Sequence, residues 1–577
     1  MTPLADLPLA PAAAGALLAL AWLAPLAGLV TLGLPERRAL ALIPLWGLSG
    51  LAAALLLPDG AAMRLPWVLT GIRLEMDPVG RVFLLLAAFL WATAGAFARG
   101  YLDGKPGARR FLGFFLVCMA GNLGLTLAQD PVAFLTFFSL MGLSAYGLII
   151  HTGTPFARRA ASVYLGAAVS GEMAALAGLL FTLGGGPGSP WGEILLVVGL
   201  GVKAGLLPLH FWLPLAHPAA PSPASAVLSG TMIKAGLLGW LRFLPLGETA
   251  LPDLGGYMIA MGLAGAFLMV AVGLPQRDPK TVLAYSSISQ MGWLAVAVGA
   301  GLAAPAAWGA LLPAILAYTL HHGLAKGALF LSTGLGGNWT SGRAGRVILG
   351  AAFALPALTI AGLPGTSGAA AKTGLKKALQ EAPGLAGVPF ELLLSLGAVA
   401  TTLLMARFLF LLGRAEPHHP PDRWLLDPWL ASVAASLALT WAWEPMRAWQ
   451  LKTLGPAELG GALWPVAAGA LLAVAGAGIA RRGQPPRAVG VPAGDLYMAA
   501  AVGLRWLWGR TTGARAVLFR LGRAMDGSWA TLYALAWRPW RRRILATDRW
   551  GWGASGTAFL LLMGAVAWAV LASLSGS

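Results

Sequence analysis

The chain has 577 residues, of which 58% are hydrophobic and 11% are charged, and its formal net charge is +18. A soluble domain has about 25% charged residues, so this composition excludes a soluble protein and predicts an all-α polytopic membrane protein. Apolar runs of about 18 to 25 residues, each long enough to cross a bilayer, recur along the chain and predict about 16 transmembrane helices. The first run, residues 9–33, lacks the charged start and cleavage site of a removed signal peptide, so we expect a retained helix.

Positive charges are concentrated in alternate loops between the predicted spans. The positive-inside rule places these loops in the cytoplasm and both chain termini outside. The net charge therefore reflects membrane topology, and we expect no nucleic-acid partner. The basic loops of the first half contain Arg37, Arg38, Arg99, Lys105, Arg109, Arg110, Arg158 and Arg159.

Lysine and arginine are distributed differently along the chain. Of nine lysines, six lie within apolar, membrane-length segments or at their breaks, whereas most arginines lie in loops. A desolvated lysine can release its proton and an arginine in practice cannot, so the distribution predicts a path for protons within the bilayer. For the first four lysines the alternative is a structural hydrogen bond at a helix break, whereas the last two are expected to extend to the membrane interface. The six are Lys203, Lys234, Lys326, Lys372, Lys376 and Lys377.

Two of the predicted spans are interrupted by proline and glycine. The first, which carries Lys203, breaks around Pro208 and Pro214, and the second breaks at Pro364 and Gly365. Breaks in corresponding halves of a membrane chain are typical of inverted-repeat transporters. The freed backbone groups need polar side chains or water, so each break predicts a hydrated cavity within the protein.

The sequence contains no pattern typical of a cofactor site. It has one cysteine, Cys118, and no cluster of Cys and His residues that predicts a metal, haem or iron–sulfur centre. A Walker loop and a dinucleotide-binding fingerprint are also absent from the sequence. We therefore expect no cofactor, no metal and no catalytic site in this chain, so that energy comes from a partner or an ion gradient. A stand-alone membrane enzyme would instead need a catalytic set at one interface.

Four stretches resemble the signatures of one family of membrane subunits. They are residues 202–234, 276–292, 321–331 and 363–368, and they occur in the family's order. They are similar to the antiporter-like membrane subunits of respiratory complex I, Mrp-type cation/proton antiporters and membrane-bound hydrogenase complexes. The resemblance covers roughly residues 75–415.

The resemblance implies a core of two inverted five-helix repeats, each with a broken helix. It also implies a line of buried ionisable residues along the membrane midplane. This proton path would consist of two broken-helix lysines, a bridging lysine, a central histidine/lysine helix and a histidine just past the first break. In that order the residues are Lys203 and Lys372, Lys234, His321 with His322 and Lys326, and His210.

One position departs from the family pattern. Relatives usually carry a glutamate on the fifth helix as the partner of the broken-helix lysine, whereas this chain has Ser139, which cannot ionise. The nearest intramembrane carboxylate is Glu172, on the following predicted span. An opposite charge within about 4 to 6 Å stabilises a buried ammonium. Either Glu172 has taken over the partner's role or proton transfer is rewired, and a structural subunit with a degenerate path is a further alternative.

The sequence divides into six predicted regions. In the fifth, arginines alternate with tryptophans, as in a helix that lies at the cytoplasmic interface and binds anionic lipid or a neighbouring subunit. The regions are N-terminal transmembrane helices (1–108), a first antiporter repeat (109–250), a second antiporter repeat (251–415), C-terminal transmembrane helices (416–484), a basic interfacial segment (485–550) and a terminal transmembrane anchor (551–577).

The resemblance implies a proton-translocating, antiporter-like subunit of a larger membrane complex, multi-pass in the inner (plasma) membrane of a prokaryote. Its partners would be other antiporter-like, redox or soluble subunits, and the transported ion would be the proton, with sodium as an alternative. Three assignments within the family stay open. They are a subunit of a proton-pumping oxidoreductase, an Mrp-type sodium/proton antiporter, and the membrane subunit of a two-component module for ion-driven inorganic-carbon uptake.

Overall fold

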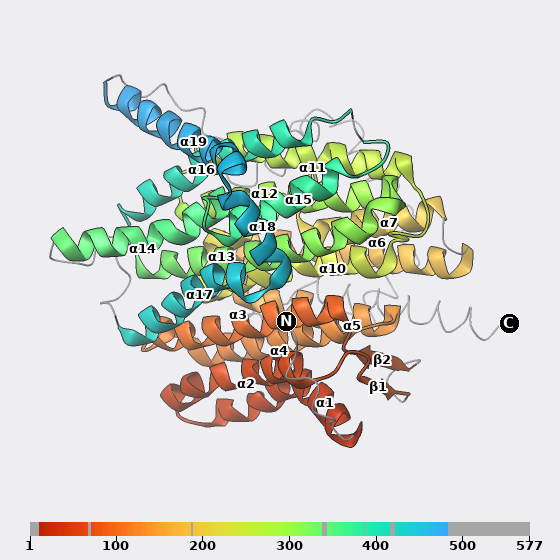
Figure 1. Cartoon of the computed structure of the whole chain (residues 1–577). Helices are drawn as coiled ribbons and strands as arrows, with labels where there is room; N and C mark the ends of the chain where they lie inside the picture. Colours follow the sequence, from red (N-terminus) through yellow and green to blue (C-terminus); the bar gives the residue numbers. More distant parts are fainter. Residues whose placement is uncertain are drawn as a thin grey trace, which may run out of the picture. The chain divides into compact units, whose positions relative to one another are not determined.

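The computed structural model describes residues 11–66, 71–185, 189–336, 343–385, 387–415 and 422–482. In this part the chain is a bundle of long helices joined by short connections (Figure 1). The predicted basic segment (485–550) and terminal anchor (551–577), with the lipid contact expected there, lie outside the described residues.

The helices, in chain order, have the following bounds. They are α1 (Pro11–Ala27), η2 (Gly28–Gly33), α2 (Glu36–Leu56), α3 (Pro78–Leu102), α4 (Ala108–Leu127), α5 (Pro131–Ile149), α6 (Pro155–Gly185), α7 (Pro190–Ala204), α8 (Leu213–Ala219), α9 (Ser222–Val227), η3 (Leu228–Met232), α10 (Lys234–Phe243), α11 (Pro252–Gly273), α12 (Pro279–Ala303), η4 (Pro305–Ala307), α13 (Trp308–Leu335), α14 (Arg343–Ala361), α15 (Ser367–Gln380), α16 (Phe390–Leu412), α17 (Arg423–Ala442), α18 (Glu444–Leu454) and α19 (Pro456–Arg482).

Three long helices begin at an Asp-Pro pair, in which the aspartate caps the helix and the proline occupies its first position. Asp77, Asp130 and Asp278 each accept a hydrogen bond from the backbone N–H three residues on, at 3.2, 2.8 and 2.8 Å. The cap satisfies a donor that has no partner within the helix, and a proline at the first position removes no helical hydrogen bond. These pairs determine where α3, α5 and α12 begin.

The chain is a multi-pass membrane protein, as its composition predicts. Twelve of the described helices are long and apolar enough to cross a membrane. The expected number of about 16 spans stays a prediction, because short broken helices fall outside this length class and the expected anchor lies outside the described residues. A short departure from an all-helical fold is the antiparallel hairpin of β1 (Ala62–Leu65) and β2 (Ile72–Glu75), between α2 and α3.

The centre of the bundle is formed by α12 and α13. Residues 281–302 of α12 and 314–335 of α13 are all buried. Glycines allow α11 and α12 to approach closely, since a Cβ at Gly262 would lie 2.6 Å from the Gly292 carbonyl oxygen. The polar side chains of the two central helices are therefore enclosed by protein.

The first predicted break separates α7 from α8 over residues 205–212. Pro208 lies in this turn, and the Trp212 indole N–H donates to the Val202 carbonyl oxygen at 2.8 Å, which satisfies a backbone group at the end of α7. Pro214 was expected in the break but is the second residue of α8. A proline in the first helical turn needs no hydrogen-bonded N–H, so Pro214 lies at the start of the short helix that follows the break.

The second predicted break separates α14 from α15 over residues 362–366 and contains Pro364 and Gly365. Gly362 and Gly365 have φ angles of 95° and 91°, a conformation that favours glycine. Both interruptions therefore lie where proline and glycine predict them. At each break a lysine lies near the end of a helix, where backbone groups have no partner within the helix.

Candidate functional site

Lys203 lies at the end of α7 and is 3% exposed. Its Nζ donates to the Tyr164 hydroxyl at 3.1 Å, and that hydroxyl donates to the Gly142 carbonyl oxygen at 2.8 Å. The Nζ also lies 5.2 Å from the centres of the Tyr164 and Phe138 rings. The ammonium is thus held by a hydroxyl and two aromatic faces, which stabilise a cation away from water.

Glu172 lies on α6 and is 2% exposed. Its Oε2 accepts a hydrogen bond from the Ser139 hydroxyl at 2.8 Å, whereas Oε1 has no hydrogen-bond partner among the described residues. A Cβ at Gly142 would lie 2.4 Å from Glu172 Oε1 and 3.2 Å from Lys203 Nζ. The two charged atoms therefore lie within about 6 Å of each other, close enough for the carboxylate to stabilise the ammonium. The serine in place of the expected glutamate orients the carboxylate of the next helix.

Lys234 is fully buried at the start of α10, directly after the π-helical turn η3. Its Nζ donates to the Ser229 carbonyl oxygen, and the Ser229 hydroxyl lies 2.8 Å from the Ser287 hydroxyl on α12. A π-helical turn disturbs the helical hydrogen-bond ladder and is frequent at functional sites. Here it provides the backbone acceptor for a lysine in the middle of the bundle.

The central helix α13 carries His321, His322 and Lys326, all fully buried. Lys326 Nζ donates to the Leu283 carbonyl oxygen on α12 at 3.1 Å, and His321 Nδ1 lies 3.0 Å from the Ser367 hydroxyl at the start of α15. Within the described chain, His321 Nε2 and both ring nitrogens of His322 have no hydrogen-bond partner. The first of these histidines therefore links the central helix to the second break.

Lys372 lies in the second turn of α15 and faces the end of α14. Its Nζ donates to the carbonyl oxygens of Ile360 and Ala361 at 3.1 and 2.7 Å. These carbonyls carry the partial negative charge of a helix C-terminus, which stabilises a nearby cation. A Cβ at Gly362 would lie 3.2 Å from Nζ, so glycine leaves room for the lysine.

His210 is buried in the turn between α7 and α8, as the sequence places it. Two further residues were not identified from the sequence. His217 on α8 is fully buried, with its ring stacked on Phe330 of α13 at 4.4 Å between centres. Lys280 lies in the first turn of α12, and its Nζ donates to the Ala220 carbonyl oxygen at 2.7 Å, just past α8. Their only sequence signal is their place in the family-like stretches.

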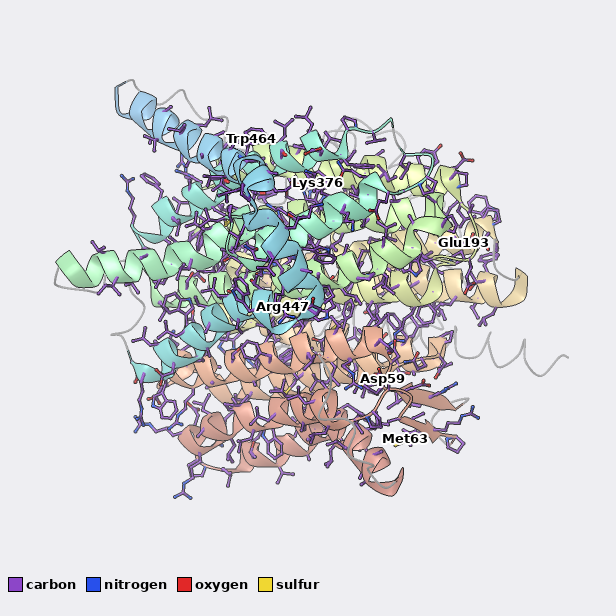
Figure 2. All side chains as sticks on the ribbon, viewed as in Figure 1. Asp59, Met63, Glu193, Lys376, Arg447 and Trp464 are labelled. Carbon is purple, nitrogen blue, oxygen red and sulfur yellow. The ribbon has the colours of Figure 1, made fainter. Side chains whose placement is uncertain are left out.

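A cavity of about 250 Å³ lies beside Lys372, between α15, α16 and α19. Its lining includes Lys376, Glu391, Glu458 and Trp464, and Figure 2 labels Lys376 of α15 and Trp464 of α19. Lys376 was expected to extend to the membrane interface. Its side chain is 28% exposed and lies close to both glutamates, and its position relative to the interface stays a prediction.

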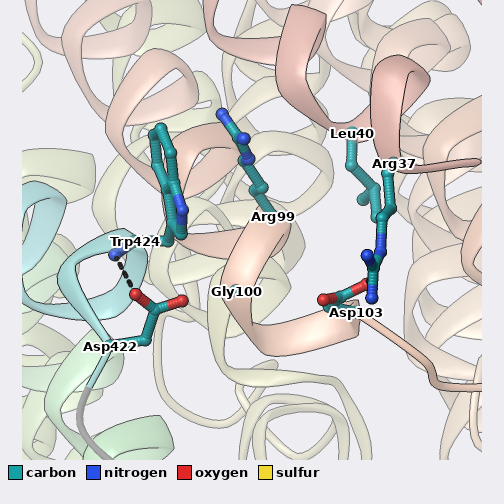
Figure 3. Close-up of a pocket in the computed structure, with 7 residues that line it drawn as sticks. All are labelled: Arg37, Leu40, Arg99, Gly100, Asp103, Asp422 and Trp424. Atoms are coloured by element: carbon teal, nitrogen blue, oxygen red, sulfur yellow. Dashed lines mark hydrogen bonds and ion pairs between the residues drawn. The ribbon is translucent and has the colours of Figure 1, made fainter.

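A second cavity, of about 240 Å³, lies between the start of α2, the end of α3 and the start of α17 (Figure 3). Arg37 pairs with Asp103 at 3.3 Å, and the Arg99 guanidinium lies 3.4 Å from the centre of the Trp424 ring. The first and third loops, which the positive-inside rule assigns to one side, therefore meet at one face of the bundle. The orientation of that face relative to the cytoplasm stays a prediction.

The arrangement brings together groups of a chemical type that can take up and release protons. Amines, imidazoles and one carboxylate lie on α6, α7, α10, α13 and α15, and hydroxyl groups and backbone carbonyls hold them in place. In the part of the chain that the structure describes, no group of three or more His, Cys, Asp or Glu side chains is placed to hold a metal ion.

Comparisons with known proteins agree with this arrangement. The family model described as NADH:quinone oxidoreductase/Mrp antiporter, TM, matches residues 128–382. Over 296 residues the chain is 31% identical to hydrogenase-4 component B of Escherichia coli, a match that covers 47% of this chain and 44% of the relative. Over 339 residues it is 32% identical to NADH-quinone oxidoreductase subunit N of Desulforudis audaxviator, with 52% of this chain and 65% of the relative covered.

The fold is similar to a solved structure of the Mrp complex from Dietzia sp., with a TM-score of 0.73 and 26% identity. That match covers 91% of this chain and 62% of the other. The chain thus spans about half to two thirds of the length of the relatives named here. The four sequence stretches, the two broken helices and these matches agree, and the chain belongs to the family of antiporter-like membrane subunits found in complex I, Mrp antiporters and hydrogenase-4.

Proposed function

We propose that this chain is a proton-translocating subunit of a larger membrane complex. The observation that carries the proposal is the series of lysines and histidines from Lys203 to Lys372, which lie on α7, α10, α13 and α15; all are buried except Lys372, which is half-buried. Burying a lysine in the middle of a membrane costs about 2.5 to 3.5 kcal/mol, so keeping the three buried lysines of this series without a function would be a large loss of stability.

Protons would enter near one broken helix and leave near the other. In the first half, Glu172 stabilises the ammonium of Lys203, and Tyr164 connects that lysine to α5 through hydrogen bonds. In the second half, the carbonyls at the end of α14 hold the ammonium of Lys372. The proton-bearing state of each end lysine is therefore stabilised by a different contact, a side-chain carboxylate for Lys203 and backbone carbonyls for Lys372.

Lys234 and Lys326 connect the two halves. Their helical segments pack tightly, since a Cβ at Gly230 would lie 3.3 Å from the Gly323 carbonyl oxygen. Like charges in a low-dielectric interior disfavour each other, so protonation of one lysine favours release of a proton by the other. Such alternation moves a proton along the bundle without moving a helix.

The partners of this subunit are inferred from its relatives. The similar Dietzia structure is that of an Mrp complex, and the relative from Desulforudis is named as a subunit of an NADH-quinone oxidoreductase. We infer a multi-subunit membrane complex in a prokaryotic cell for this chain too. The partner subunits supply the driving reaction or the opposing ion gradient.

The proposal is tested by proton flux in proteoliposomes that contain the complex with this subunit. Lys234→Ala removes the bridging amine and is expected to reduce flux at least tenfold, while Lys452→Ala, an exposed lysine on α18, serves as the matched control and retains flux. Assembly is checked in both variants by purification of the intact complex. Unchanged flux in Lys234→Ala would contradict a path through this lysine.

A further inference from the structure

The cavity beside Lys372 is lined by a group of charged side chains. Lys372 and Lys376 lie one helical turn apart on α15, and both line the cavity. Glu391 is the second residue of α16 and Glu458 the third residue of α19, so the two carboxylates come from the starts of two helices. The cavity mouth is therefore formed by charged groups, with the proposed proton carrier behind them.

One ammonium serves both carboxylates at this mouth. Lys376 Nζ forms an ion pair with Glu391 Oε1 and lies 4.0 Å from Glu458 Oε2. The Glu391 and Glu458 side chains are 60% and 42% exposed, whereas Lys376 is 28% exposed. The lysine is thus the inner member of the group, with an acidic residue on either side.

Without this lysine the mouth would be suited to a metal cation. Hard cations such as Ca²⁺ bind to carboxylate oxygens from flexible sites, and two glutamates with the nearby hydroxyls of Thr373 and Ser395 are ligands of that kind. A Lys376 ammonium at the same place excludes such a cation by occupying its ligands and by charge repulsion.

We propose that Lys376 is a tethered cation that keeps metal ions out of the mouth serving Lys372, so that this side of the subunit accepts protons only. The inference rests on the proposed function, in which Lys372 exchanges protons. A proton crosses such a mouth by transfer between waters and side chains. A metal ion has to move through the mouth itself and needs oxygen ligands there. Lys376 is therefore a specificity-determining residue and not itself a carrier.

The test compares Lys376→Gln with Lys377→Gln in the reconstituted complex. Lys377 is the neighbouring lysine, 56% exposed and 3.9 Å from Glu381, so it is a matched control. We expect Ca²⁺ to inhibit proton flux through Lys376→Gln, with half-inhibition at about 1 mM, as for weak protein sites. Wild type, Lys377→Gln and the charge-retaining Lys376→Arg should be insensitive at that concentration. Equal insensitivity of Lys376→Gln would overturn the proposal.

A binding measurement separates this proposal from the proposed function. Trp464 lines the cavity and can sensitise the luminescence of Tb³⁺, used as a probe for Ca²⁺. Lys376→Gln should show added Tb³⁺ luminescence relative to wild type, and the further changes Glu391→Gln and Glu458→Gln should abolish it. This readout needs no proton flux, so it can succeed even if transport fails. No added luminescence in Lys376→Gln would refute the cation-excluding role.

Discussion

Removing the charge of Glu172 should nearly stop proton transfer at Lys203. Glu172→Gln keeps the shape of the side chain and its contact with Ser139, but it removes the negative charge within about 6 Å of the Lys203 ammonium. At an effective dielectric constant of about 20, that charge is worth about 3 kcal/mol to the ammonium. This corresponds to a change of about 100-fold in the equilibrium constant for protonation of Lys203.

The assay is proton flux into proteoliposomes under an imposed membrane potential, followed with a trapped pH-sensitive dye. We expect flux through Glu172→Gln to fall by up to about 100-fold, because protonation of Lys203 limits entry. The double variant Ser139→Glu with Glu172→Gln should recover part of it, since the Ser139 hydroxyl lies 2.8 Å from the Glu172 carboxylate and a glutamate there restores one charge.

The control is Glu193→Gln, which changes another buried glutamate, in the first turn of α7 and ten residues before Lys203. It should retain most of the flux. Wild-type flux in Glu172→Gln would refute the reasoning, because it would show that Lys203 transfers protons without a carboxylate partner.

Three further predictions follow from single positions. Gly142→Ala should reduce flux with little loss of stability, because the new Cβ would lie 2.4 Å from Glu172 Oε1 and displace that flexible side chain. The control Gly166→Ala should leave flux unchanged, because no atom lies within 4 Å of a Cβ at that position. Cysteine at Ser189 should react with an impermeant maleimide from outside, and cysteine at Thr152 only after permeabilisation; the opposite pattern would invert the topology. Burial, with Arg110 and Lys105 nearby, lowers the pKa of His151 to about 4. Between pH 6.5 and 4 the unfolded state therefore binds more protons than the folded state, so the melting temperature should fall as the pH drops through this window. The fall should be smaller in His151→Gln than in wild type. Equal falls in the two proteins would exclude His151 as a cause.

The broken helices and their lysines could be predicted from the sequence because their signals are local. Proline and glycine interrupt an apolar run, and a lysine within such a run is costly enough to be noticed. Both breaks lie at the expected places, although Pro214 is helical. A proline can end one helix or begin the next, and the sequence alone does not distinguish these roles.

The contacts between helices could not be predicted in the same way. Tyr164 lies 39 residues before Lys203, and no periodicity in the sequence indicates that its hydroxyl would accept from that lysine. Lys376 was expected at the interface because it is near a helix end, and its partners Glu391 and Glu458 are 15 and 82 residues further on, too far along the chain to be predicted. Packing of distant segments decides whether such a lysine extends to the interface or turns inward.

The contact between Ser139 and Glu172 depends on how the helices pack, which the sequence alone does not show. From sequence, Glu172 was one of two explanations for the missing fifth-helix glutamate. The structure places its carboxylate against the Ser139 hydroxyl and beside Lys203, a contact that depends on the absence of a side chain at Gly142. A glycine on the facing helix is therefore part of the candidate site, although its type alone gives no functional signal.

The central claim, that protons exchange at the buried lysines of this chain, is tested most directly with Lys203→Arg. The variant keeps a positive charge in the same place, but an arginine in practice cannot release its proton. The measurement is proton flux in proteoliposomes containing the intact complex, compared with wild type. The account predicts that Lys203→Arg assembles and loses flux as completely as Lys203→Ala. Full flux in the arginine variant would contradict it.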